Sequence, residues 1–191
     1  MIFQISAIVI LILFYGFYIA KIILQNKRSI KTNQMGSGNK PSKVLMIERI
    51  MSLATVLTII IELCSIFIAK NPPMEQIRFF GLLIGIFSVI IFGSATITMK
   101  DSWRVGIPEE RTVLVTNGIY KWSRNPAFVG FDLLYLSMCL LFFNILLLIV
   151  SVWAAVMLHL QILQEEKYMK DTFGSDYITY MKHTSRYFGK R

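Results

Sequence analysis

Cysteine, histidine and charged residues are scarce in this chain. Its 191 residues include two cysteines and two histidines, and only 16% of them are charged. Cys64 and Cys139 lie in apolar runs without the spacing of metal ligands, so we interpret both as small core residues rather than as a disulfide or a site. His159 lies alone in an apolar run and His183 alone in a basic tail, and neither is assigned to a site. The sequence therefore shows no zinc or haem motif.

The shortage of charge excludes an ordinary soluble domain. About a quarter of the residues of a soluble domain are charged, whereas this chain is 55% hydrophobic, with a mean hydropathy of +0.59. We therefore expect an all-α integral membrane protein that forms one domain over residues 1–191. Acidic residues are especially few: 20 basic against 11 acidic residues leave a net charge of +9. Because the basic residues cluster between apolar runs, we expect membrane lipids, and no nucleic acid, as partners.

Four apolar runs predict about five membrane spans. Residues 2–24, 50–69 and 79–99 each suit one helix, since a span needs about 20 residues. The first run has no basic leader and a long core, which favours an anchor helix over a signal peptide. Residues 127–163 are too many for one span, because a helix of these 37 residues would measure about 55 Å against a membrane core of about 30 Å. This run must fold back, and Asn144 is the predicted turn of a helical hairpin.

The segments between and within the spans carry further signals. Residues 25–44 are polar and rich in glycine and serine, which predicts a flexible loop, and residues 70–73 predict a short turn. Glu62 lies at membrane depth, where a carboxylate serves either a function or a hydrogen bond between helices; both interpretations stay open. The third run carries a stripe of small residues that predicts close helix packing: Gly81, Gly85, Ser88 and Gly93.

The placement of basic residues tests the count of five spans. Three segments hold nearly all of them: Lys27, Arg28, Lys31, Lys40, Lys43 and Arg49 in the first loop; Lys100, Arg104, Arg111, Lys121 and Arg124 before the hairpin; Lys167, Lys170, Lys182, Arg186, Lys190 and Arg191 in the tail. Only Lys70 and Arg78 are expected on the opposite side. By the positive-inside rule the three basic segments and the C-terminus are cytoplasmic and the N-terminus is outside. An odd number of spans requires this arrangement.

A polar stretch before the hairpin, residues 116–130, combines several local signals. Asn117-Gly118 suits a tight turn because both residues tolerate positive φ. Asn125-Pro126 reads as a helix start, with Asn as the N-cap and Pro in the first helical position. Free backbone N–H groups at such a helix end attract an anionic ligand group.

Two motifs in this half of the chain resemble a known family. The first consists of Gly118, Tyr120, Arg124-Asn125-Pro126, Phe128 and Gly130; the second consists of Glu165-Glu166, Met169, Phe173-Gly174, Tyr177, Tyr180 and Arg186. In this order, with a membrane run between them, they resemble the isoprenylcysteine carboxyl methyltransferase family and its phospholipid methyltransferase relatives. This sequence departs from the family pattern with Asn125 for His, Phe128 for Tyr and Met169 for Leu. The resemblance covers residues 102–186, so we interpret residues 1–100 as a three-span scaffold and residues 101–191 as a methyltransferase-like catalytic region.

The resemblance implies an enzyme that methylates a lipophilic acceptor with S-adenosylmethionine at the cytoplasmic membrane face. It implies cofactor contacts at Thr112, Val113, Leu114, Val115, Tyr120, Asn125, Pro126, Ala127, Phe128 and Glu165. Gln161, one helical turn before Glu165, falls at the acceptor-binding position, where the isoprenylcysteine enzymes have Arg. Arg104 and Arg124 are catalytic candidates that could hold a carboxylate, and Glu166 is a candidate base. The acceptor, a carboxylate, hydroxyl or thiol of a lipid or isoprenoid, would reach the site from the membrane; no metal is implied, and the oligomeric state is left open.

Simpler and competing interpretations stay open at this point. In the simpler interpretation the aromatic residues form an interfacial belt, the arginines only set topology, and the two glutamates lie on a solvated helix end paired with Lys170 or Arg186. Membrane sterol reductases, which bind NADPH, have a related C-terminal motif and are one alternative. A non-catalytic membrane scaffold is the other.

Overall fold

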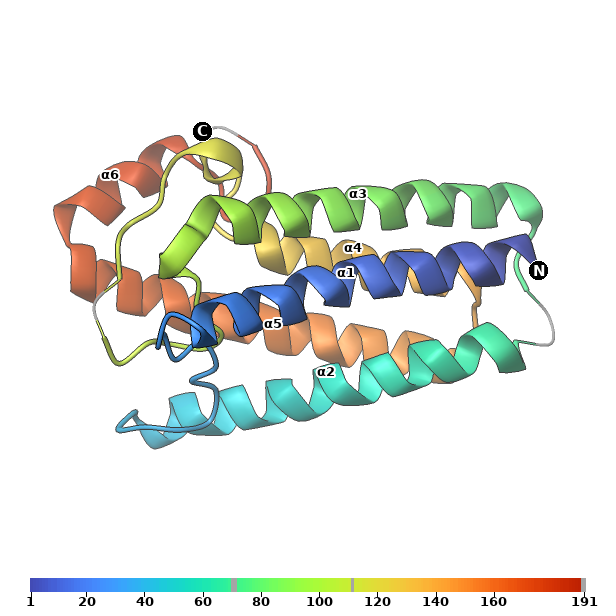
Figure 1. Ribbon diagram of the computed structural model, residues 1–191, viewed down its shortest axis with the longest axis horizontal. Helices are drawn as coiled ribbons and strands as arrows, with labels where there is room; N and C mark the ends of the chain where they lie inside the picture. Colours follow the sequence, from blue (N-terminus) through green and yellow to red (C-terminus); the bar gives the residue numbers. More distant parts are fainter. Residues whose placement is uncertain (70–71, 111, 190–191) are drawn as a thin grey trace.

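A computed structural model describes residues 1–69, 72–110 and 112–189 as a bundle of five long helices with a sixth, short helix at one end (Figure 1). The helices are α1 (Ile2–Asn26), α2 (Ser42–Ile68), α3 (Glu75–Met99), α4 (Pro126–Leu141), α5 (Ile145–Phe173) and α6 (Ser175–His183). Two 3-10 turns, η1 (Lys100–Ser102) and η2 (Gly118–Lys121), lie between α3 and α4. The predicted all-α membrane fold is confirmed. Some predicted features lie outside the described residues: the first part of the turn at 70–73, with Lys70, and the basic residues Arg111, Lys190 and Arg191.

The helices match the predicted spans in number but not all in length. By length and composition α1, α2, α3 and α5 suffice to cross a membrane. Helix α4 has 16 residues and measures about 24 Å, somewhat less than the membrane core of about 30 Å. It nevertheless lies along α3 and returns the chain from the end of the bundle that carries α6 to the end that carries the N-terminus (Figure 1). The bundle therefore has four full spans and one shorter helix.

The predicted hairpin turn at Asn144 is confirmed. Asn144 is the N-cap of α5, and its side-chain oxygen accepts a hydrogen bond of 2.8 Å from the backbone N–H of Leu147. Its amide nitrogen donates to the hydroxyl of Ser65 near the end of α2, also over 2.8 Å. The turn is thus fixed to the neighbouring helix as well as to its own.

Two helices extend beyond the predicted apolar runs. Helix α2 begins at Ser42 rather than at residue 50, and α5 continues to Phe173, ten residues past the end of its apolar run. Gly174, with φ of +53°, ends α5 in the left-handed region that favours glycine. Apolar residues mark where a helix lies in the membrane, whereas the helix itself persists into the polar layer. These extensions carry Glu48, Glu165 and Glu166.

The small-residue stripe of α3 is a packing surface, as predicted. A Cβ added to Gly81 would lie 3.0–3.2 Å from atoms of α4, and the hydroxyl of Ser137 on α4 donates to the Gly81 carbonyl over 2.7 Å. The hydroxyl of Ser88 donates in turn to the carbonyl of Gly130 over 2.9 Å. Close approach of the two backbones therefore fixes α4, and with it the start of α4 at the motif loop.

The first loop is not the flexible segment that its composition predicted. It runs beside residues 103–107: the N–H of Gln34 donates to the Val105 carbonyl over 2.9 Å, and the N–H of Val105 donates to the Thr32 carbonyl over 3.0 Å. A composition rich in glycine and serine indicates a loop, but it does not indicate whether the backbone of the loop forms hydrogen bonds with another segment. In this protein the loop forms such bonds with residues 103–107.

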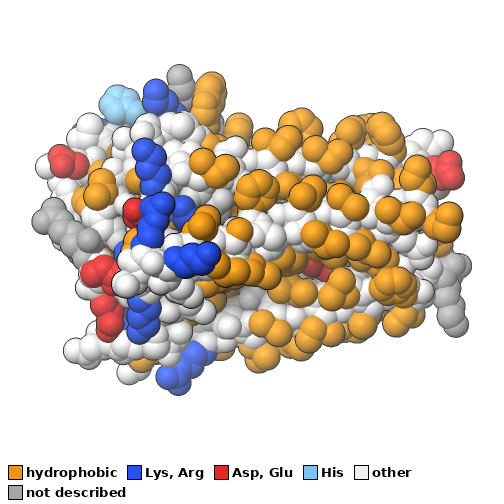
Figure 2. Space-filling view, in the orientation of Figure 1, with side chains coloured by type: hydrophobic (Ala, Val, Ile, Leu, Met, Phe, Trp, Pro, Cys, Tyr) orange, Lys and Arg blue, Asp and Glu red, His pale blue; other side chains and the backbone are white. Residues whose placement is uncertain are grey.

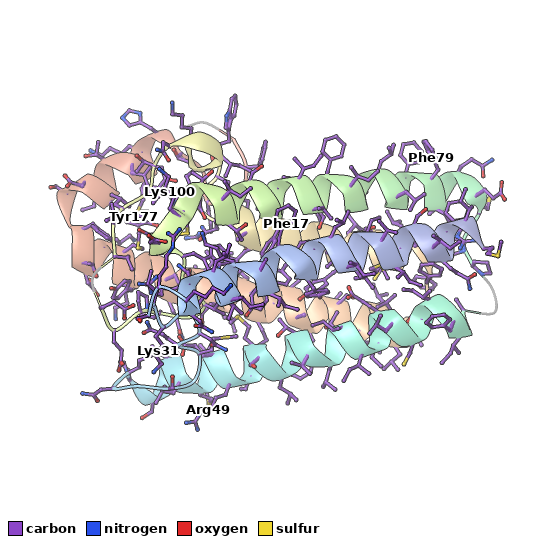
Figure 3. All side chains as sticks on the ribbon, viewed as in Figure 1. Phe17, Lys31, Arg49, Phe79, Lys100 and Tyr177 are labelled. Atoms are coloured by element: carbon purple, nitrogen blue, oxygen red, sulfur yellow. The ribbon has the colours of Figure 1, made fainter. Side chains whose placement is uncertain are left out.

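Charge is separated along the bundle as predicted. Apolar side chains cover the length of the helices, while Lys and Arg gather at the end that holds the loops and α6 (Figure 2). Lys31, Arg49 and Lys100 lie at this end and Phe79 lies at the other (Figure 3). We call the first of these the basic end. Arg78 lies at the opposite end, as predicted, with its guanidinium 4.1 Å from the ring centroid of Phe3.

Candidate active site

A cavity of about 370 Å³ opens at the basic end of the bundle, between the helices and the loops that cover them. Its lining comes from all six helices, with α3 contributing Met99, from the first loop and from the segment between α3 and α4. One wall, which we call the motif wall, is formed by Leu114, Val115, Tyr120, Arg124, Asn125, Pro126, Ala127, Phe128, Glu165, Glu166, Met169, Tyr177 and Tyr180. A second wall, the loop wall, is formed by Asn33, Met35, Trp103, Arg104, Val105 and Gly106. The two motifs, forty residues apart in sequence, thus meet at one cavity.

The motif loop is shaped by one glycine. Gly118 has φ of +57°, and a Cβ there would lie 2.9 Å from the Thr98 side chain, so only glycine fits this position without strain. Asn117 does not share the positive φ that the sequence suggested; its φ is −97°. The turn that follows directs Tyr120 inward, where its ring is 5% exposed. Burial raises the pKa of the Tyr120 phenol well above its ordinary value, so this group stays neutral at physiological pH.

Helix α4 begins at Pro126 with Asn125 in the N-cap position, as predicted, but the Asn125 side chain makes no capping hydrogen bond. Its amide nitrogen donates to the Arg186 carbonyl over 3.1 Å and to Glu166 over 3.4 Å. These bonds turn the amide toward the tail, which passes directly beside the motif loop. Ala127 and Phe128 lie in the first turn of α4, where backbone N–H groups have no acceptor within the helix, and both line the cavity.

Glu166 joins the motif loop, α5 and the tail. One carboxylate oxygen accepts from Arg124 over 2.7 and 3.1 Å, and the other accepts from Arg186 over 2.9 and 3.1 Å. The side chains of Arg124 and Glu166 are 3% and 5% exposed. The backbone N–H of Arg124 also donates to the Ser185 carbonyl over 3.0 Å, which ties the tail to the loop a second time. The charges of Arg124 and Glu166 are therefore committed to each other and to Arg186.

Glu165, the preceding residue, also lines the cavity but is not part of this ion-pair cluster. One of its carboxylate oxygens accepts a hydrogen bond of 3.1 Å from the amide of Gln161, one turn earlier on the same face of α5. The second oxygen has no hydrogen-bond partner within the described part of the chain. Two adjacent glutamates thus have different environments, and Glu165 is the one that can accept from a ligand.

The remaining predicted site residues differ in whether they line the cavity. Arg104 lines the cavity from the loop wall; its guanidinium donates to Glu110 over 2.6 Å and to two backbone carbonyls. Thr112 and Val113 do not line it, and Val113 is 70% exposed, because the extended segment turns only Leu114 and Val115 inward. Gln161 is fully buried beneath Glu165 and does not reach the cavity either.

The structure adds residues that the sequence did not single out. The inner part of the cavity is apolar and is lined by residues of the first two helices: Tyr15, Tyr18, Met51, Ser52, Thr55, Val56 and Ile59. Trp103 forms part of the loop wall and packs edge-on against Phe92, with ring centroids 5.9 Å apart. These residues belong to no motif. The one signal in the sequence was a pair of tyrosines, Tyr15 and Tyr18, on neighbouring turns of an otherwise apolar run.

Glu62 lies apart from the cavity. Its side chain is fully buried and does not line the cavity, and neither of its oxygens has a partner at hydrogen-bond geometry in the described structure. The hydroxyls of Tyr15 and Tyr135 are likewise buried and without such a partner.

Comparison with known proteins places this site in a family. A family model described as phospholipid methyltransferase matches residues 76–176. The chain is 26% identical over 118 residues to the protein-S-isoprenylcysteine O-methyltransferase of Xenopus laevis, which is 58% of this chain and 41% of that protein. It is 36% identical over 75 residues to the protein of the same name from Saccharomyces cerevisiae, which is 38% of this chain and 30% of that protein.

The matches agree with the geometry. The chain spans less than half the length of the two curated relatives, and the family model covers more than half of the chain, from the start of α3 into α6. That range includes the first motif, the helices between the motifs and the second motif as far as Gly174, while Tyr177, Tyr180 and Arg186 lie beyond it. The resemblance to the isoprenylcysteine and phospholipid methyltransferases seen in the sequence is therefore confirmed, and the chain belongs to the phospholipid methyltransferase family.

Proposed function

We propose that this protein transfers the methyl group of S-adenosylmethionine to a lipophilic acceptor at the basic end of the bundle. One observation carries the proposal: a single cavity joins the polar motif residues around Glu165 and Asn125 to an apolar interior between membrane helices. A polar cofactor and an apolar acceptor can therefore meet without leaving the protein. Membership of the family supports the methyltransferase over a reductase or an inactive scaffold.

The residues of the motif wall fit such a cofactor. The unpaired oxygen of Glu165 can accept a hydrogen bond from an amine or from ribose hydroxyls. The first turn of α4, at Ala127 and Phe128, offers backbone N–H groups to a carboxylate. The rings of Tyr120 and Phe128 offer flat faces to an adenine or to a cation. When bound, S-adenosylmethionine supplies an electrophilic methyl group, so the main tasks of the protein are to orient the reactants and to exclude water.

The roles of the charged residues follow from their partners. Arg124 and Glu166 line the cavity but neutralise each other, so we propose that they hold the motif loop in place rather than act on the acceptor. Arg104 lies on the opposite wall; Glu110 and two carbonyls hold its Nε and Nη1, and we propose that its Nη2 attracts an anionic acceptor head group. A carboxylate acceptor needs no base. A hydroxyl or thiol acceptor needs one, and Glu165 is the nearest group with an oxygen available.

The acceptor is proposed to reach the cavity sideways from the membrane, between α1 and α2. These helices pack together over few residues, whereas each packs closely against another helix. Val56 on α2 lines the cavity and is also 50% exposed on the outer surface, so the wall is thin there. Phe128 and Phe131 line the cavity that this path would reach. Helix α5 contributes Leu158, whereas Met157 lies in the apolar cluster with residues of α2 and does not line the cavity.

Two measurements test the proposed function. Radiolabelled S-adenosylmethionine should bind to the purified protein and NADPH should not; the reverse result would favour the reductase. For the acceptor, a series with one head group and increasing tail length should show a falling KM, because each buried CH₂ contributes roughly 0.8 kcal/mol. The effect on kcat should be smaller if the tail binds equally in the ground and transition states. Equal KM values across the series would point to a water-soluble acceptor.

The orientation in the membrane is part of the proposal. The gathering of basic residues at one end supports a cytoplasmic site and C-terminus, with the N-terminus outside. Single cysteines at Ser37 and Lys182, both exposed at this end, should react only with reagents that reach the cytoplasm once Cys64 and Cys139 are replaced. Labelling of either position from outside the cell would show that the protein has the opposite orientation.

A further inference from the structure

Glu48 lies on the first turns of α2, outside both motifs, and is fully buried. Its carboxylate accepts hydrogen bonds from the backbone N–H of Gly36 over 2.7 Å and from the backbone N–H of Ile107 over 2.9 Å. The ammonium of Lys40 donates to both of its oxygens, over 2.9 and 3.0 Å. One side chain thus holds α2, the first loop and the segment after α3 together.

The two segments that Glu48 holds are the loop wall of the cavity. Met35 precedes Gly36, and Gly106 precedes Ile107, and both Met35 and Gly106 line the cavity. The packing leaves no spare room: Gly106 has φ of +85°, and a Cβ there would lie 2.9 Å from a Glu48 oxygen and 3.1 Å from the Cα of Met35. A shift of Glu48 must therefore move residues that line the cavity.

The ion pair at this point differs from another that joins the same regions. Lys40 and Glu48 have side chains 5% and 0% exposed. Arg28 and Asp101, which also join the first loop to the segment after α3, are 63% and 54% exposed. Burial of a charged pair costs desolvation energy and is weak evidence of stabilisation by itself, whereas it can fix one geometry. The exposed pair supplies a matched control for the buried one.

We propose that Glu48 is a positioning residue that sets the affinity of the cavity for its ligand by fixing the loop wall opposite the motif wall. It does not touch the ligand. Only the choice of S-adenosylmethionine as the ligand rests on the proposed function; the fixing of the wall does not. The first loop and the start of α2, in the part of the chain that matches no motif, thereby belong to the binding site.

The test compares Glu48→Gln with Asp101→Asn in the full-length protein. Glutamine keeps the shape but presents an NH₂ group where two donors require an acceptor. We expect Glu48→Gln to weaken the binding of radiolabelled S-adenosylmethionine at least tenfold, measured well below the unfolding temperature, and Asp101→Asn to leave it within twofold. In a Trp122→Phe/Trp153→Phe background the emission of Trp103, on the loop wall, should shift in Glu48→Gln and not in Asp101→Asn.

A purely structural role predicts different results. The double variant Lys40→Met/Glu48→Gln removes the unpaired ammonium and should regain thermal stability without regaining affinity; recovery of both would overturn the proposal. Wild-type affinity and emission in folded Glu48→Gln would overturn it as well. If Glu48→Gln does not fold, Gly106→Ala moves the same wall without removing a charge, and it should weaken binding about fivefold. Failure of the wild-type protein to bind S-adenosylmethionine would refute the proposed function, while the Trp103 emission still tests Glu48 without any ligand.

Discussion

The two walls of the cavity are held in the same way but by different partners. On each, a buried carboxylate at the polar end of a long helix uses both oxygens to fix two other segments: Glu166 on α5 and Glu48 on α2. Glu166 is held by the side chains of Arg124 and Arg186, whereas Glu48 is held by the Lys40 ammonium together with two backbone N–H groups. Contacts between side chains require particular residue types, so they leave a motif in the sequence. Contacts to the backbone, which here fix the loop wall, leave almost none, because every residue except proline has an N–H group.

The largest effect is expected when the motif wall is broken. Glu166→Gln leaves two arginines without their carboxylate, one of them in a nearly dry environment. Removal of one partner from a buried pair costs about 3–5 kcal/mol. Denaturation of the purified variant in detergent micelles should show a loss of this size.

The comparison of the two walls would lose its basis if Glu166→Gln were as stable as the wild type. Loss of stability in Glu166→Gln should be at least as large as in Glu48→Gln, since two guanidinium groups are left unpaired instead of one ammonium. A larger loss in Glu48→Gln would show that the loop wall contributes more to the stability of the protein than the motif wall.

A smaller change in stability and a clear change in binding are expected at Glu165. Glu165→Gln removes the charge that faces the cavity but keeps a group that can pair with Gln161. Stability should change by no more than about 1 kcal/mol, while S-adenosylmethionine binding should weaken by about 1.5–3 kcal/mol, as for a hydrogen bond to a charged group. Equilibrium binding and thermal unfolding of the same sample separate the two. Unchanged affinity would remove Glu165 from the proposed cofactor site.

Single neutral hydrogen bonds compare the outer supports of the walls. The Tyr180 hydroxyl donates to the Tyr120 carbonyl over 2.6 Å on the motif wall, and the Thr32 hydroxyl donates to the Gln25 side chain over 2.8 Å beside the loop wall. Tyr180→Phe and Thr32→Val should each destabilise the protein by about 0.5–1.5 kcal/mol. Thermal unfolding measures both losses of stability. A much larger loss in one variant would show that the outer support of that wall contributes more to stability than the support of the other wall.

The smallest effect is expected at the exposed ion pair. Asp101→Asn removes the partner of Arg28 where both side chains are more than half exposed. Exposed pairs contribute about 0–1 kcal/mol, and salt screens them. Unfolding should therefore show a small difference from the wild type at low salt, and that difference should shrink at high salt. A loss above 2 kcal/mol would mean that exposure does not distinguish the two pairs that join these loops.

The sequence by itself determined the architecture. Lengths of apolar runs predicted the helices, the excess run after residue 127 predicted the hairpin at Asn144, and the placement of lysine and arginine predicted the basic end. These features depend on how single residues partition between lipid and water, which is a property of composition along the chain. The motifs likewise predicted that Tyr120, Phe128 and Glu165 would meet at one site, and they line one cavity.

Only the tertiary structure decided which hydrogen-bond and ion-pair partners the polar side chains have. Asn125 takes the predicted N-cap position of α4, but its side chain bonds to the tail; Glu165 and Glu166, adjacent in sequence, both line the cavity, but only Glu166 belongs to the ion-pair cluster; and the first loop forms a wall. Each of these outcomes depends on which donor or acceptor lies within about 3 Å, and that is set by segments distant in the chain. Partition between lipid and water is read from one residue at a time, whereas a hydrogen bond depends on two residues whose separation the fold decides.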